Sequence, residues 1–249
     1  MDIGGWTRDT GSRPRLHLLG GFELRCGGRP VAMPRSAQRL AAYLAVRGRP
    51  QQRIAVAGRL WPEVPDDRAQ ACLRSALWRL GAGDTSLATA TRDEVALAPD
   101  VAVDLHELER AIDGALGPGE SPPATPHVLR LLTREVLPGW YEDWAVSERE
   151  RLKDLSLHAL EALAEGLLDS GRPREAARCA FAAVQGEPLR ESSQRLLIRA
   201  YLADGNTALA VRSYDAYRAT LARELGEEPS WLMADVRAAI RWPAGRAAS

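Results

Sequence analysis

Residues 67–80 read Asp67-Arg-Ala-Gln-Ala-Cys-Leu-Arg-Ser-Ala-Leu-Trp-Arg-Leu80, and their spacing predicts an amphipathic helix. At about 100° per residue, one side of this helix is apolar and is expected to face a core: Ala69, Leu73, Ala76, Leu77 and Leu80. The other side has no acidic residue: Arg68, Ala71, Arg74, Ser75, Trp78 and Arg79. A solvated helix usually mixes Glu with Arg, so this composition favours a surface that meets nucleic acid, where Arg and Ser bind base edges or phosphates.

Trp78 is the unusual member of this surface, and two interpretations stay open for it. The indole could supply an apolar surface for thymine methyl groups or sugars. It could equally pack beneath a neighbouring hairpin as part of the core.

The elements around this helix have the order of a winged helix. Residues 15–31 alternate like strands and contain Gly27-Gly28, a two-residue hairpin signal. Two short helices are predicted over 36–46 and 54–61, the second with Ile54 among its apolar residues. Asp67 is expected to cap the third helix, with Gln70 as its reciprocal partner. A second hairpin is predicted around Arg92-Asp93.

Beyond Pro99 the sequence is almost entirely helical and contains an internal repeat of 34 residues. Helices are predicted over 104–116 and from about 127 onward, separated by a Pro- and Gly-rich linker. The repeat pairs six positions: Leu163/Leu197, Leu168/Leu202, Gly171/Gly205, Ala176/Ala210, Arg178/Arg212 and Ala182/Ala216. This is the tetratricopeptide period, in which glycine turns between helices and alanine permits their close approach. Two copies are fewer than the ~3 usual for a stable solenoid, so residues 104–134 are a candidate for a divergent third.

Composition separates two regions and excludes several classes of protein. Residues 1–100 hold 15 arginines against 10 acidic residues, whereas the remainder holds 18 basic and 23 acidic residues. This asymmetry favours a basic module that meets a polyanion. Three separated cysteines form neither a disulfide framework nor a metal motif, and the chain has no phosphate loop, HExxH or GxSxG. We therefore expect no enzyme activity, cofactor or metal, and a cytoplasmic protein without a membrane span.

Several short segments, spread over both regions, form a distinctive combination. The first region carries Leu18-Leu-Gly-Gly-Phe-Glu-Leu, Gly28-Arg-Pro-Val, Leu60-Trp-Pro and Leu73-Arg-Ser-Ala-Leu-Trp-Arg-Leu. The second carries Leu137-Pro-Gly-Trp-Tyr-Glu-Asp-Trp, Glu148-Arg-Glu-Arg-Leu, Glu187-Pro-Leu-Arg-Glu-Ser and Glu224-Leu-Gly-Glu-Glu-Pro. Together these segments resemble the Streptomyces antibiotic regulatory protein family. The resemblance covers about residues 15–242, and the combination is more specific than any single segment.

This resemblance implies a mainly α protein with an OmpR-type winged helix over 15–100 and a tetratricopeptide-like bacterial transcriptional activation domain over 101–242. Residues 1–14 and 243–249 are expected to be disordered tails. Larger members of the family add an ATPase and further repeats. The sequence to Ser249 includes neither, so nucleotide control within it is not expected.

The implied function is a nucleoid-associated activator that binds direct repeats at promoters as a head-to-tail homodimer. It would recruit RNA polymerase holoenzyme and control a biosynthetic gene cluster, for example for an antibiotic. The family's recognition positions fall on Arg74, Ser75, Trp78 and Arg79. The alternative is a helical-repeat adaptor whose N-terminal domain binds protein rather than DNA.

Two sets of site residues complete the prediction. Further DNA contacts are expected at Arg68, at Arg92 on the hairpin, and at Arg35 and Arg39 on the first helix. The loop between the second and third helices is expected to contact polymerase through Glu63, Asp66 and Asp67, because this loop has that role in the family.

Overall fold

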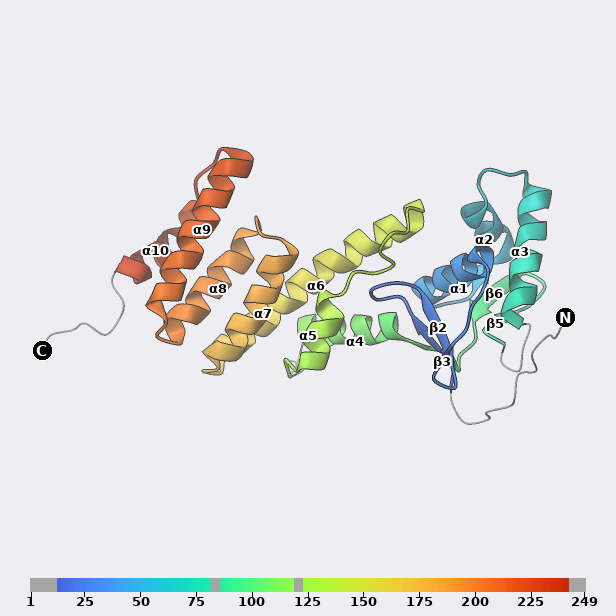
Figure 1. The fold of residues 1–249 in the computed structure, drawn as a ribbon, viewed down its shortest axis with the longest axis horizontal. Coiled ribbons are helices and arrows are strands. Elements are labelled where there is room, and N and C mark those ends of the chain that lie inside the picture. The colour runs from blue at the N-terminus through green and yellow to red at the C-terminus, as the bar shows by residue number, and fades with distance from the viewer. Residues whose placement is uncertain (1–12, 82–85, 119–122, 242–249) are drawn as a thin grey trace, which may run out of the picture. The chain divides into compact units, whose positions relative to one another are not determined.

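The computed structural model describes residues 13–81, 86–118 and 123–241 (Figure 1). Apart from Arg13 and Pro14, the two expected tails lie outside the described residues. The chain divides into two compact units. The first comprises residues up to Glu107 together with Glu135–Arg149, and the second comprises Leu108–Arg134 together with residues from Glu150 onward.

The first unit opens with a small sheet whose strand order is β3-β2-β1-β7. Its strands are β1 (Arg15–His17), β2 (Glu23–Cys26), β3 (Arg29–Pro30) and β7 (Ala102–Val103). β1 pairs antiparallel with β2 and parallel with β7, and β2 pairs antiparallel with β3. The predicted turn at Gly27 and Gly28 is confirmed, since both have positive φ, at 57° and 76°. A hairpin turn of this kind favours glycine for that reason.

Three helices and a second sheet complete the winged helix predicted from the sequence. The helices are α1 (Arg35–Arg47), α2 (Arg53–Leu60) and α3 (Asp66–Gly81), and both α1 and α2 pack against α3. The second sheet has the order β4-β6-β5, with β4 (Gln51–Gln52), β5 (Ala88–Ala90) and β6 (Glu94–Leu97). Fully buried leucines from the helices form the core: Leu40, Leu44, Leu60, Leu73 and Leu80. The hairpin of β5 and β6 is the wing.

Two details of the helices differ from the sequence prediction. α3 begins at Asp66, and the Pro65 carbonyl accepts the N–H groups of Arg68 and Ala69 at 2.9 Å each. Asp67 therefore lies inside the first turn, and its predicted capping role is wrong because Pro65 starts the helix earlier. Ile54, expected on the apolar side of α2, has 79% of its surface exposed.

The first unit also includes a segment that returns from far along the chain. Gly20 donates to the Glu135 carbonyl at 2.7 Å, and Leu137 donates to the Leu18 carbonyl at 2.8 Å. Leu19 and Val136 form an antiparallel bridge between these two hydrogen bonds. The compact unit is therefore wider than the expected range 15–100.

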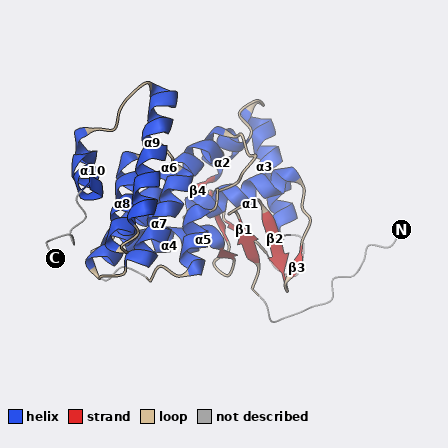
Figure 2. Ribbon diagram, turned by 60° about the vertical axis from the view of Figure 1, so that its left-hand side comes forward, coloured by secondary structure: helices blue, strands red, loops and turns tan. Residues whose placement is uncertain are grey.

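The second unit consists of helices, whereas the strands in red in Figure 2 belong to the first. Two helices span a unit boundary: α4 (Asp104–Leu116) and α6 (Asp143–Asp169). The others are α5 (Pro126–Thr133), α7 (Pro173–Gly186), α8 (Glu191–Ala203), α9 (Thr207–Leu225), the 3-10 turn η1 (Trp231–Met233) and α10 (Ala234–Arg241). α7 packs against α5 and α8, α8 against α9, and α10 against both α8 and α9.

The 34-residue repeat appears as two turns with the same hydrogen bonds. Gly171 and Gly205 have φ values of 71° and 74°. Gly171 donates to the Leu168 carbonyl as Gly205 donates to that of Leu202, at 3.0 Å in both cases. The next residue in each copy donates five residues back, at 2.8 Å, which completes the Schellman geometry of a helix end.

A buried carboxylate joins two helices of the second unit. Glu161 on α6 is 9% exposed and accepts hydrogen bonds from Arg190 Nε at 2.9 Å and Nη2 at 3.0 Å. The hydroxyls of Ser192 and Ser193 also donate to it, at 2.6 Å each. Burial raises the pKa of Glu161, but these hydrogen bonds outweigh burial and hold the pKa below its ordinary value.

Candidate nucleic-acid interface

α3 separates its apolar and polar residues as its sequence predicts. Ala69, Leu73, Ala76 and Leu80 are buried, and Leu77 is half-buried. All six residues of the acid-free surface are exposed: Arg68, Ala71, Arg74, Ser75, Trp78 and Arg79. We call these six residues the α3 face. It presents three guanidinium groups on a rigid helix whose opposite side is anchored in the core.

Trp78 belongs to the α3 face and not to the core. Its side chain is 68% exposed, and the guanidinium carbon of Arg79 lies 5.9 Å from its ring centroid. The structure thus excludes the interpretation that Trp78 packs beneath the wing. An exposed indole between arginines adds an apolar contact surface to a cationic one.

The wing holds Arg92 at an ordered turn between β5 and β6. Thr91 donates its N–H to the Glu94 carbonyl at 2.9 Å, and its hydroxyl accepts from Glu94 N at 3.0 Å. Arg92 is exposed at this turn. It belongs to a different element from the α3 face, so it can contact a different part of a ligand.

Arg53 supports the wing, a role that the sequence prediction missed. Its backbone N–H donates to the Asp93 carbonyl at 2.8 Å, and its Nη1 donates to the Thr91 carbonyl at 3.3 Å. Arg53 therefore connects the start of α2 to the turn that carries Arg92. Its position directly after the polar strand Gln51–Gln52 was the available signal.

Arg35 and Arg39 have partners inside the protein. Arg39 Nη2 donates to the Leu60 carbonyl at 2.5 Å, and its Nε lies 3.1 Å from Glu142 Oε1. Arg35 Nη2 lies 3.3 Å from the same oxygen, and its guanidinium carbon lies 3.7 Å from the ring centroid of Trp140. The role of Arg35 and Arg39 in DNA binding stays a prediction. The contacts of the half-buried Arg39 count against it, whereas the side chain of Arg35 is 51% exposed and keeps donors other than Nη2.

The segment 135–149 is held to the winged helix by aromatic packing and by one arginine. Trp140 lies 5.9 Å from Phe22, and Trp144 lies 5.4 Å from Tyr43, between ring centroids. Arg149 donates to the carbonyls of Val136, Leu137 and Trp140, at 2.9, 2.6 and 2.7 Å. Its hydrogen bonds hold Leu137 at a φ of 46°, a left-handed conformation that non-glycine residues rarely adopt.

The loop between α2 and α3 exposes the three acidic residues assigned to polymerase. Glu63, Asp66 and Asp67 are all exposed. Asp66 and Asp67 lie in the first turn of α3, where the helix dipole favours negative charge. The loop thus presents carboxylates on a rigid support.

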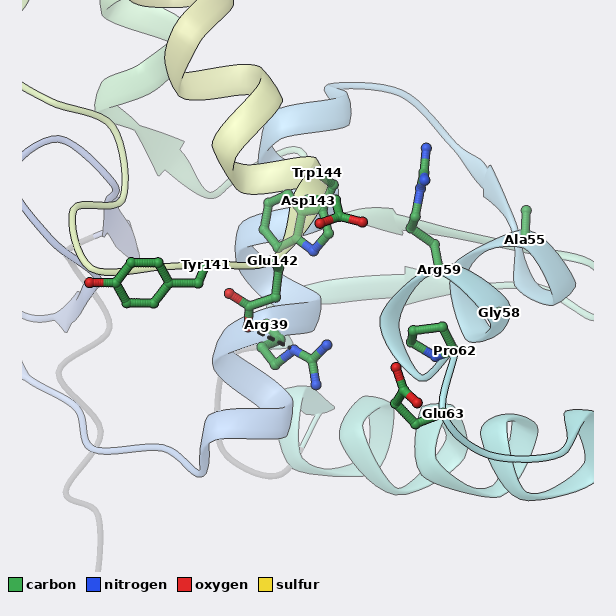
Figure 3. A pocket seen from close by; sticks show the side chains of 10 residues that line it. All are labelled: Arg39, Ala55, Gly58, Arg59, Pro62, Glu63, Tyr141, Glu142, Asp143 and Trp144. Carbon is green, nitrogen blue, oxygen red and sulfur yellow. Dashed lines mark ion pairs between the residues drawn. The ribbon is translucent and has the colours of Figure 1, made fainter.

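Glu63 also lines a hollow of about 520 Å³, which we call the α2 groove (Figure 3). Its other walls come from Ala55, Gly58 and Arg59 of α2 and from residues 141–144. Figure 3 shows the ion pair of Arg39 and Glu142 on one side of the hollow and Pro62 and Glu63 on the other. The ring of Tyr141 points away from this ion pair. The sequence prediction missed the α2 groove because its walls are far apart in the chain.

In the described part of the chain, no group of three His, Cys, Asp or Glu side chains could hold a metal ion. No helix in it has the length and apolarity needed to cross a bilayer.

Comparisons with known proteins find matches in both sequence and fold. A family model described as the bacterial transcriptional activator domain matches residues 128–241. Regulatory protein AfsR of Streptomyces coelicolor is 30% identical, and the match covers 86% of this chain and 23% of AfsR. The chain thus spans about a quarter of that relative.

A solved structure shares the fold. Mycobacterium tuberculosis EmbR, solved in complex with a low-affinity phosphopeptide, superposes with a TM-score of 0.67 at 23% identity. The match covers 92% of this chain and 65% of the EmbR chain. Residues 128–241 thus belong to the bacterial transcriptional activator domain family, while the chain as a whole is similar in sequence to part of AfsR and in fold to EmbR.

Proposed function

We propose that this protein is a sequence-specific DNA-binding activator whose α3 lies in the major groove of promoter DNA. The observation that carries the proposal is the α3 face, in which all six residues are exposed, three are arginines and none is acidic. Arg74, Ser75, Trp78 and Arg79 contact base edges, and Arg68 contacts the phosphate backbone. Arg92 on the wing contacts phosphate or enters the minor groove.

The proposal extends to partners. The protein binds direct repeats as a head-to-tail pair and recruits RNA polymerase through Glu63, Asp66 and Asp67. The genes it controls belong to a biosynthetic cluster. The family resemblance and the exposure of the three carboxylates support this part of the proposal.

The DNA-binding role can be tested with one added charge. Ala71 lies on the α3 face, and Ala71→Glu places a carboxylate there without weakening the helix, because Glu is a good helix former. Binding to a pool of genomic DNA fragments should identify preferred promoters, and Ala71→Glu should abolish that binding. The matched control is Ala216→Glu, at an exposed position of α9. If the wild-type protein binds no fragment, the adaptor alternative is favoured.

The polymerase role has a separate test. Glu63→Ala combined with Asp66→Ala should lower transcription in vitro at saturating protein while promoter affinity stays unchanged. Equal transcription by this variant and the wild type would remove the loop from the activation mechanism. The control is Glu227→Ala, an exposed acid of the second unit.

A further inference from the structure

The α2 groove continues from the acidic loop, and the two share Glu63. Residues 141–144, which form its far wall, lie within the range matched by the activator-domain family, although they pack in the first unit. The surface around Glu63 is therefore built both from α2 and its following loop and from residues within the range of the activator-domain family. It is larger than the loop between α2 and α3.

Exposed apolar side chains flank the α2 groove. Tyr141 on its lining is 84% exposed. Ile54, 79% exposed, is not part of the lining but directly precedes Ala55 and lies one helical turn from Gly58. Aromatic residues such as tyrosine are enriched where proteins bind one another. Neither Tyr141 nor Ile54 packs into the core of this unit.

The charges of the α2 groove favour a basic occupant. Glu142 is paired with Arg39 and Arg35, so its charge is neutralised inside the protein. Glu63 and Asp143 have no ion-pair partner among the described residues. The carboxylates of Asp66 and Asp67 lie close by in the chain. Arg59 is the opposing charge on this lining.

We infer that the α2 groove and the acidic loop form one docking surface for a basic segment of RNA polymerase holoenzyme, in which an apolar side chain enters the groove and a lysine or arginine meets Glu63 and Asp143. The inference rests on the polymerase role proposed above and extends it to residues 141–144. A second copy of this chain is the competing occupant. We favour polymerase because the groove is continuous with the loop assigned to it.

Gly58 provides a way to block the groove without disturbing the fold. A Cβ atom built at Gly58 meets no atom within 4 Å, and the residue lies inside a helix. Gly58→Gln therefore projects a side chain into the hollow and favours the helix. Gly166, inside α6, has the same open surroundings, so Gly166→Gln is the matched control. At saturating promoter occupancy, Gly58→Gln should lower activated transcription about fivefold or more, and Gly166→Gln should not.

A crosslinking measurement identifies the occupant directly. The photoreactive amino acid p-benzoylphenylalanine at Ala55, on the groove lining, should crosslink to a polymerase subunit in the complex of full chain, promoter DNA and holoenzyme. The same group at Ala216 should not. A crosslink to a second copy alone, or no crosslink, overturns the inference, as does full transcription by Gly58→Gln. Loss of activity in the Glu63 and Asp66 variant with a fully active Gly58→Gln would leave the loop's role standing and remove only the groove.

Discussion

The guanidinium of Arg35 stacks on the ring of Trp140, with 3.7 Å between the guanidinium carbon and the ring centroid. The same guanidinium group forms an ion pair with the carboxylate of Glu142. Cation and aromatic ring come from segments that are far apart in the sequence but belong to one compact unit. Residues 135–149 are thus a structural part of the winged helix, and they cover Leu18, Leu19 and Phe22.

Removing this segment should destabilise the first unit. A chain ending at Glu107 lacks Trp140 and Trp144, which pack on Phe22 and Tyr43. We expect it to lose cooperative thermal unfolding, whereas a chain ending at Arg149 should unfold cooperatively and bind the preferred promoter. Circular dichroism and DNA titration of both chains measure this. Equal stability of the two would show that the segment adds nothing to the unit.

Arg149→Ala should lower the free energy of unfolding of the first unit by about 1–3 kcal/mol, because three backbone carbonyls lose their donor. Faster hydrogen exchange at the amides of Gly20 and Leu137 should accompany the loss, since both bond across the bridge that the segment forms. Arg199→Ala, at an exposed position of α8, is the control. Unchanged exchange in Arg149→Ala would contradict the role of this arginine.

Arg74→Ala and Arg92→Ala should differ in kind. Arg74 projects from the α3 face, so its loss should cost about 1–3 kcal/mol on the preferred operator and flatten discrimination at one or two base pairs. Arg92 lies on the wing, and its loss should weaken most sequences evenly. Neither residue is part of the core, so circular dichroism should show both variants folded. Titrations on single-base operator variants decide the matter: an unaltered specificity profile for Arg74→Ala rules out base reading by Arg74.

The buried Glu161 should make the second unit sensitive to acid. Its pKa is lowered in the folded state, so the charged network contributes stability above the unfolded pKa of about 4.3 and loses it as pH falls through the folded pKa. Glu161→Gln should therefore be clearly less stable than wild type at pH 7, and the difference should shrink below about pH 4. Urea unfolding at both pH values measures it. Glu175→Gln, which breaks an exposed pair with Arg172, should leave the unfolding midpoint unchanged at pH 7; a constant difference for Glu161→Gln across pH would be evidence against the charged network.

Local periodicity was enough to predict the α3 face, because the side of a helix on which Leu73 or Arg74 lies depends only on neighbours within two turns. The turns at Gly27, Gly171 and Gly205 were predictable for a similar reason, since a left-handed backbone strongly favours glycine.

Contacts between distant segments were not predictable in this way. Nothing near Arg39 in the sequence indicates that Glu142 will be its partner, so an arginine that ties two segments looks like one that is free for DNA. The left-handed Leu137 was equally hidden, because Arg149 and Leu18 impose that conformation through hydrogen bonds made only in the folded unit.

The discontinuous first unit has a consequence for synthesis on the ribosome. Residues 108–134 are translated before Glu135–Arg149, so the first unit cannot complete its fold while only its first hundred residues have been synthesised. At about 5–20 residues per second, the ribosome needs roughly 2–8 s to pass from Glu107 to Arg149. During that interval Leu18, Leu19 and Phe22 lack the contacts that they make with residues 136–140 in the folded unit. We expect the first unit to complete its fold only after Arg149 has been synthesised, when synthesis has already entered the range matched by the activator-domain family.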